Sequence, residues 1–195
     1  AQEYLQVFPS HNQVLNYLAD YFMDFMNLDH SLNNKNLKKA AELDYCYIKA
    51  FDAPQRPPLD PASLSPEELE SLTEKVFYLQ EHVYLFQEER AFTALRAIKL
   101  EDDELPLELP KKQPGQWLIF RNLLSVLECI LLNEAQWRIL QAIQSGLPFS
   151  QALEKAFSEL PEEESEKLGP DIGTWFNQWV SWGIFSLEKP RDHTA

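Results

Sequence analysis

Apolar residues recur every three or four positions over several long segments of the chain, which is the spacing of one face of an α-helix. The first such segment opens with Ser10 and Gln13 in capping-box spacing and predicts a helix that packs inward. Its apolar face consists of Val14, Leu15, Leu18, Phe22, Phe25 and Met26. A second helix is predicted from about Asn36 to Phe51.

The third predicted helix has the clearest start signals in the chain. Ser65 is placed to cap it, Pro66 occupies its first position, and Glu68 follows the cap by three residues. Its apolar residues are Leu69, Leu72, Val76, Leu79, Val83 and Phe86. We therefore expect one helix from Pro66 to about Lys99, which completes an N-terminal helical bundle over residues 1–100.

A change of composition predicts a second domain. The segment 101–114 contains three prolines and several acids, as expected for a linker, so residues 115–195 form a separate unit. Its first part, "QWLIFRNLLSVLECILLN", is rich in branched and aromatic residues and favours two short strands in a hairpin, although a helix stays open. Three helices are predicted after it, over Glu134–Ser145, Phe149–Glu159 and about Asp171–Trp182, followed by a possible short strand in "IFSLEK". The acidic run "PEEESE" between the last two helices is interpreted as a solvated linker.

The expected fold class is therefore mainly α. An N-terminal helical bundle is followed by a C-terminal winged-helix-like α+β domain with a small antiparallel sheet. The chain has no run of eighteen apolar residues and no secretory leader pattern, so we expect a cytoplasmic protein without a membrane span.

The sequence offers few groups for catalysis. The histidines His11, His30, His82 and His193 are scattered, and Cys46 and Cys129 are too far apart for metal-ligand spacing. The five glycines form no phosphate-binding loop, and no serine lies in a nucleophile-elbow pattern. We predict no catalytic residue, no metal ligand and no cofactor in this chain.

The segment 132–157 has the helix, glycine turn and helix that are typical of DNA-binding proteins, but its charge disfavours DNA. The net charge of the chain is −14, and Lys155 is the only cation of the helix that would enter the major groove. The carboxylates that would approach phosphates are Glu154, Glu159, Glu162, Glu163 and Glu164. A peptide that pairs with the edge of the sheet suits this scaffold better than nucleic acid.

Short matches along the C-terminal domain resemble the RiPP recognition element, a clamp for the leader peptides of ribosomally made natural products. They are "LLN", Ala135, "IL" at 139–140, "SG" at 145–146, "AL" at 152–153 and "WFNQWVSWGIF", over roughly residues 115–189. Together with the N-terminal segment "YCYIKAFDAPQRPPLD", the chain resembles the C proteins of methanobactin biosynthesis, the MbnC family.

The resemblance implies a subunit that works with an iron-containing MbnB-like oxidase. The clamp binds the leader of a precursor peptide, a basic one in view of the charge of this chain, and the irons of the partner use dioxygen to convert cysteines into oxazolone and thioamide groups of a copper chelator. The leader then adds beside "LECILLN" and lies against the last long helix. The expected peptide contacts are Glu128, Ile130, Leu132, Trp175 and Trp179.

Several alternatives stay open at this stage. Trp175 and Trp179 are spaced so that they equally close a small core; if they are peptide walls, substituting them weakens binding and leaves the fold intact. Arg90, Arg121 and Arg138 are each possible groups that reach the substrate. The N-terminal helical domain is expected to dock the partner. A free-standing peptide-binding adaptor, and less favourably a DNA-binding regulator, are the competing functions.

Overall fold

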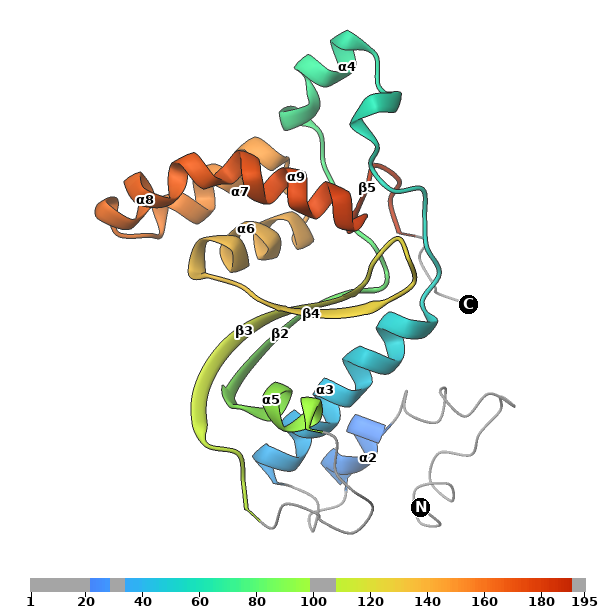
Figure 1. The fold of residues 1–195 in the computed structure, drawn as a ribbon, viewed down its shortest axis with the longest axis vertical. Coiled ribbons are helices and arrows are strands. Elements are labelled where there is room, and N and C mark those ends of the chain that lie inside the picture. The colour runs from blue at the N-terminus through green and yellow to red at the C-terminus, as the bar shows by residue number, and fades with distance from the viewer. Residues whose placement is uncertain (1–21, 29–33, 99–107, 191–195) are drawn as a thin grey trace. The chain divides into compact units, whose positions relative to one another are not determined.

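The protein is described by a computed structural model over residues 22–28, 34–98 and 108–190 (Figure 1). It is a mixed α+β protein in which 54% of the described residues are helical and the strands form two small antiparallel sheets. The hairpin of two strands predicted in residues 116–133 is confirmed, and the alternative of a helix there is wrong.

The chain divides into two compact units, and neither unit is one continuous stretch of sequence. The first contains Ala1–Lys49 and Glu88–Gly115, and the second contains Ala50–Gln87 and Gln116–Ala195. The sequence analysis placed residues 1–100 in one domain, whereas here residues 50–87 group with the C-terminal part.

The first unit contains most of helix α3 (Lys35–Asp52), and this helix confirms the second predicted helix. Helix α2 (Phe22–Leu28) is the described end of the first predicted helix, whose remainder lies outside the described residues. Helix α5 (Phe92–Ala97) is joined to α3 by an ion pair of 2.7 Å between Arg96 and Asp44. Buried Glu88 accepts a hydrogen bond of 3.1 Å from the backbone N–H of Thr93, which fixes the first turn of α5.

The single helix predicted from Pro66 to Lys99 is wrong. Its start is confirmed, because Ser65 and Glu68 form a capping box at helix α4 (Pro66–Glu70), but α4 has only five residues. The chain continues through a 3₁₀ turn (Leu72–Glu74), strand β1 (Tyr78–Leu79) and strand β2 (Val83–Arg90) before α5.

The error has a physical cause in β2. Val83 and Leu85 point to one face of the strand and pack on the core, while Phe86 on the other face is also buried. A strand that is buried on both faces produces a continuous apolar run, and such a run imitates a helical pattern.

The larger sheet has the strand order β2-β3-β4, with β3 spanning Lys112–Arg121 and β4 spanning Leu127–Leu131. β3 and β4 pair antiparallel, with Trp117 opposite Leu131 and Arg121 opposite Leu127. The turn between them is closed by Asn122, whose side-chain oxygen accepts hydrogen bonds of 2.9 and 3.0 Å from the backbone N–H groups of Leu124 and Val126.

The three helices predicted after the hairpin are confirmed as α6 (Glu134–Gln144), α7 (Phe149–Ser158) and α9 (Ile172–Trp182). Figure 1 shows them together on one side of β4. The predicted terminal strand is β5 (Phe185–Ser186), which pairs with β1. The acidic run interpreted as a linker is instead helix α8 (Glu162–Leu168), which has no buried residue.

The core of the second unit explains why residues 50–87 group with the C-terminal part. Phe77 is fully buried, and its ring centroid lies 5.5 Å from that of Phe149, 5.8 Å from that of Phe176 and 5.5 Å from that of Phe185. One phenylalanine between β1 and the preceding turn thus contacts α7, α9 and β5, and its burial contributes about 2–3 kcal/mol.

Helix α9 ends at Gly183, which adopts a left-handed backbone conformation. Gly183 has φ +72°, and a Cβ atom there would lie 2.3 Å from Cδ2 of Leu123 in the hairpin turn. We expect Gly183→Ala to destabilise the protein by about 2 kcal/mol or more, from backbone strain and from displacement of Leu123. The measurement is the free energy of unfolding in urea.

Gly173→Ala is the matched control on the same helix. Gly173 has no heavy atom within 4 Å of the position of an added Cβ and does not have a positive φ. Because alanine is the better helix former, this change should be neutral or stabilise by up to about 1 kcal/mol. Equal losses in both variants would contradict the role given to Gly183.

Candidate functional site

Strand β4 lies at one edge of the three-stranded sheet. The backbone N–H of Leu132 donates to Gln116 O at 2.8 Å, and that of Asn122 donates to Val126 O at 2.9 Å. In an antiparallel ladder the hydrogen-bonded pairs alternate along the strand, so Glu128 and Ile130 also bond to β3. The residues at the alternate positions of β4, among them Leu127 and Leu131, direct their backbone N–H and C=O groups away from β3.

Leu127 and Leu131 therefore present backbone donors and acceptors at the open side of the sheet. No hydrogen bond joins their outward N–H and C=O groups to another residue in the described part of the chain. Leu131 is 59% exposed, so solvent reaches this edge. An extended peptide can form ladder hydrogen bonds with such groups.

The three strand residues that the sequence analysis predicted to contact a peptide lie at the positions that alternate with Leu127 and Leu131. Glu128, Ile130 and Leu132 share one face, but their peptide groups belong to the ladder with β3. Leu132 is buried in the core of the second unit, and Ile130 packs against that core. Glu128 is half-buried and accepts a hydrogen bond of 3.1 Å from Nδ2 of Asn122.

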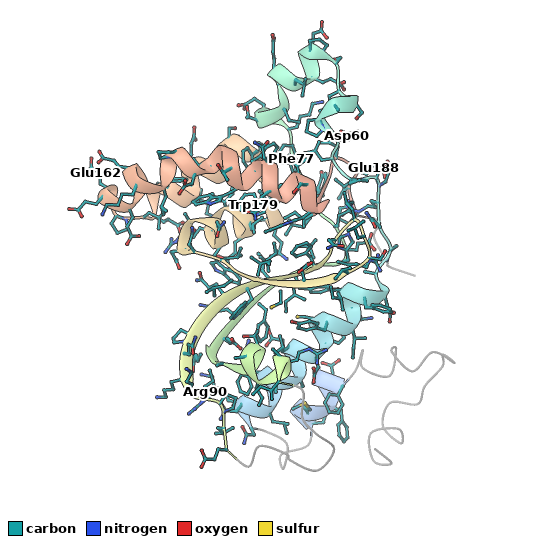
Figure 2. The ribbon with its side chains drawn as sticks, in the orientation of Figure 1. Asp60, Phe77, Arg90, Glu162, Trp179 and Glu188 are labelled. Carbon is teal, nitrogen blue, oxygen red and sulfur yellow. The ribbon has the colours of Figure 1, made fainter. Side chains whose placement is uncertain are left out.

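Trp175 and Trp179 both belong to the same core. They are 7% and 1% exposed, and the ring of Trp179 meets that of Phe185 edge-on at 6.1 Å. In Figure 2, Trp179 lies on the side of α9 that faces α6. Of the five residues expected to contact a peptide, Ile130, Leu132 and the two tryptophans thus meet in one apolar cluster, and little of it is accessible.

Exposed apolar side chains gather around the hairpin. The most exposed is Leu124, at 84%, and it is followed by Leu131, Val126 and Leu123. These four residues, here called the hairpin apolar residues, come from nine consecutive positions of the sequence. Because large exposed apolar groups cost free energy in water, this concentration makes the hairpin a candidate surface for a partner or ligand.

The sequence analysis did not identify Leu127 and Leu131. The alternation of side chains along β4 could be predicted from the sequence. Which of its backbone groups bond to β3 depends on the pairing of Leu132 with Gln116, and only the folded structure shows that pairing. The one local signal is Asn122, whose side chain fixes the turn and with it the register.

A concave feature lies within the first unit. A cavity of about 270 Å³ is bordered by one residue of α2 and by one face of α3. Its lining is Phe22, Leu37, Ala40, Ala41, Asp44, Tyr45 and Ile48. Most of these side chains are apolar, so the cavity suits an apolar side chain of a partner better than a polar metabolite.

The three arginines considered as reaching groups are all engaged. Arg90 donates to Pro110 O at 2.8 Å, and Arg121 donates to the carbonyl oxygens of Phe51 and Ala53. Arg138 pairs with Glu134 on α6 and with Glu159, which directly follows α7. Each of these guanidinium groups holds parts of its own unit together.

The described residues contain no arrangement of groups that could hold a metal ion by three or more His, Cys, Asp or Glu side chains. Burial, and secondarily Glu42, raises the pKa of the Cys46 thiol to about 12, so this sulfur is protonated at neutral pH and is a poor nucleophile. The described residues therefore offer an open sheet edge and an apolar cavity.

Comparison with known proteins does not assign the chain to a family. No protein-family model matches it, and no curated protein gives a significant sequence match. Of the helices that the structure describes, none has the length and apolar character needed to cross a bilayer.

Because Trp179 is buried in the core, its substitution tests the stability of the fold and not a contact with a peptide. Trp179→Ala should lower the free energy of unfolding by about 3–5 kcal/mol, because it leaves a large cavity in the core of the second unit. Trp179→Phe should cost much less, since it keeps most of the ring and removes a buried indole N–H that has no hydrogen-bond partner. Chemical denaturation followed by circular dichroism measures both.

Leu124→Ala is the surface control and should change stability by about 0.5 kcal/mol or less. A Trp179→Ala variant as stable as wild type would show that the core is not packed around this ring.

Proposed function

We propose that the chain is a non-catalytic subunit that binds the leader of a ribosomally made precursor peptide and presents its cysteines to an iron-dependent oxidase. The irons and the oxidative chemistry belong to an MbnB-like partner, and the products are the oxazolone and thioamide groups of a methanobactin-type copper chelator. The observation that carries this proposal is the open edge of β4 beside the helices of the second unit.

The arrangement of the second unit supports the proposal. An antiparallel sheet of three strands is followed by α6, α7 and α9, which is the order of a winged-helix-like peptide clamp. The resemblance to the RiPP recognition element implies that a leader pairs with the third strand of such a sheet and lies near the third helix. The corresponding elements here are β4 and α9, and β4 is an edge strand.

Charge supports a basic peptide and disfavours DNA. The chain has 31 acidic against 17 basic side chains, and the exposed residues of α7 and α8 include several glutamates. Lys155 and Lys167 are the only cations of these two helices. Because DNA affinity comes largely from cations that neutralise phosphates, a leader rich in Lys or Arg is the better complement.

The first unit is proposed to dock the oxidase subunit. Its apolar cavity on α3 lies beside exposed Phe22 and Leu37, and Leu28 at the end of α2 is 64% exposed. Apolar surface of this kind is typical of the centre of protein–protein interfaces. The proposed complex acts in the cytoplasm.

A free-standing peptide-binding adaptor is the second candidate, because the β4 edge serves it equally well. Purification of the tagged chain from its native cell, with mass spectrometry and iron analysis, separates the two functions. An iron-containing protein that co-purifies in near-equal amount supports the oxidase subunit. A chain that emerges alone and without iron contradicts that proposal and favours the adaptor.

Leu131→Pro tests the binding edge. Proline removes the outward N–H of residue 131, and that N–H takes no part in the ladder with β3. We expect the fold to survive and the affinity for the leader peptide to fall about tenfold or more, since a ladder hydrogen bond is lost and the ring obstructs the incoming strand. Isothermal titration with a synthetic basic leader peptide measures the change.

Leu131→Ala is the matched control, because it shortens the same exposed side chain and keeps the N–H. It should weaken binding much less than Leu131→Pro does. Equal effects of the two variants would mean that the side chain, and not the backbone edge, holds the peptide.

A further inference from the structure

Glu128 is a half-buried carboxylate on the edge strand β4, and its hydrogen-bonding capacity is only partly used. Its Oε1 accepts a hydrogen bond of 3.1 Å from Nδ2 of Asn122, and none of the ion pairs between described residues includes it. We propose that Glu128 selects a lysine or an arginine at one defined position of the peptide that pairs with β4. This selection rests on the proposed function and determines where along a basic peptide its charge must lie.

Glu128 differs in this respect from the other shielded carboxylates. Those that are at least half-buried in the described part of the chain are Glu42, Glu81 and Glu88. The first two pair with cations, at 2.6 and 3.8 Å from nitrogen to oxygen, and both oxygens of the third accept hydrogen bonds from Thr93. Because a charge that leaves water is normally paired, the missing cation at Glu128 points to a partner outside the described residues.

The neighbours of Glu128 within the sheet are apolar. Opposite it on β3 lies Phe120, whose fully buried ring stacks on Trp182 with the ring centroids 5.0 Å apart. Val126 and Ile130, two positions away along the chain in either direction, carry no side-chain donor. The remaining side is the open edge of the sheet, so a donor that approaches the carboxylate from there belongs to an added strand.

The ladder of β4 places one side chain of an added strand beside Glu128. We take the added strand as antiparallel, which continues the arrangement of this sheet and is the more stable pairing. Its hydrogen bonds form at Leu127 and Leu131, so the residue opposite Glu128 belongs to a non-hydrogen-bonded pair. In such a pair the Cα atoms lie about 4.5 Å apart and the two side chains project from the same face, within reach of an ion pair.

Desolvation makes this position selective. An added strand removes water from Glu128, and a neutral residue opposite it leaves the carboxylate without compensation, whereas a lysine or an arginine pairs with it. The chain's net charge of −14 favours cations anywhere on a peptide, but it does not fix their position. Ile130 adds a second requirement, since an antiparallel peptide meets it two residues before Glu128 and an apolar residue fits best there.

The test selects random peptides of about nine residues, displayed on phage, against the immobilised full chain, because this length covers β4 and its flanks. Peptides retained by the wild-type chain should share one position that is Lys or Arg, with an apolar residue two positions before it. Glu128→Lys should change the preference at that position to Asp or Glu. An unchanged preference for Lys or Arg in a folded Glu128→Lys chain would overturn the selection.

Isothermal titration with one retained peptide measures the pair itself. Glu128→Gln, and replacement of the peptide's selected Lys or Arg by Gln, should each weaken binding about fivefold or more. The two changes together should cost little more than either alone, because they remove the same ion pair. Glu128→Gln keeps an acceptor for Asn122, so this cycle decides if Glu128→Lys fails to fold, and fully additive losses contradict the proposal.

Glu154→Lys is the matched control for net charge. Glu154 is exposed on α7, and its substitution changes the charge of the chain by the same amount as Glu128→Lys does. It should leave the preference for Lys or Arg at the selected position intact. Equal loss of the preference in both variants means general attraction between an acidic chain and basic peptides, and overturns the role of Glu128.

Failure of this selection differs from failure of the proposed function. Peptides that lose affinity in Leu131→Pro but show no preference that depends on Glu128 overturn the selection alone and leave the binding edge in place. A wild-type chain that retains no peptide contradicts both the selection and peptide binding at β4.

Discussion

The register of β4 and the proposed binding edge both depend on one constraint, the hydrogen-bonding requirement of the backbone at β4. Peptide groups of Glu128 and Ile130 are used in the ladder with β3, while those of Leu127 and Leu131 point away from it. The packing of Ile130 and Leu132 on the core of the second unit fixes this parity, because a shift of one residue would expose the apolar face. The same burial that stabilises the sheet thus determines which groups are left for a partner strand.

Under the proposed function, the helix–turn–helix of the second unit supports the sheet and does not read DNA. α6 and α9 place their large side chains, among them Leu140 and Trp179, in the core against the sheet. Their outward surfaces and those of α7 and α8 are polar, with few cations. A scaffold of this kind holds one face of β3 and β4 rigid and leaves the edge of the sheet accessible.

Local signals predicted much of the fold. Several ends of helices and strands depend only on residues within a few positions of one another, so they could be located from the sequence. These ends are marked by the capping box at Ser65, the turn at Asn122 and the positive-φ glycines 146 and 183. Segment 78–90 could not, because its apolar residues are buried on both faces of β2 and imitate a helix.

The candidate site could be located only in part. The sequence analysis chose the strand and the helix on which the proposed site lies, β4 and α9. Its choice of Glu128, Leu132 and Trp179 followed side-chain alternation, whereas accessibility is decided by tertiary packing. Leu127 and Leu131 become recognisable only when the ladder with β3 is known. Arg121 illustrates the same limit, since it contacts a residue 70 positions away in the sequence.

Residue-resolved amide hydrogen exchange on the chain, with and without the leader peptide, tests the central claim most directly. The account predicts that the amides of Leu127 and Leu131 exchange fast in the free protein and become protected when the peptide binds, while those of Glu128 and Ile130 are protected in both states. Binding of the peptide with no added protection at Leu127 and Leu131 would contradict pairing at the β4 edge.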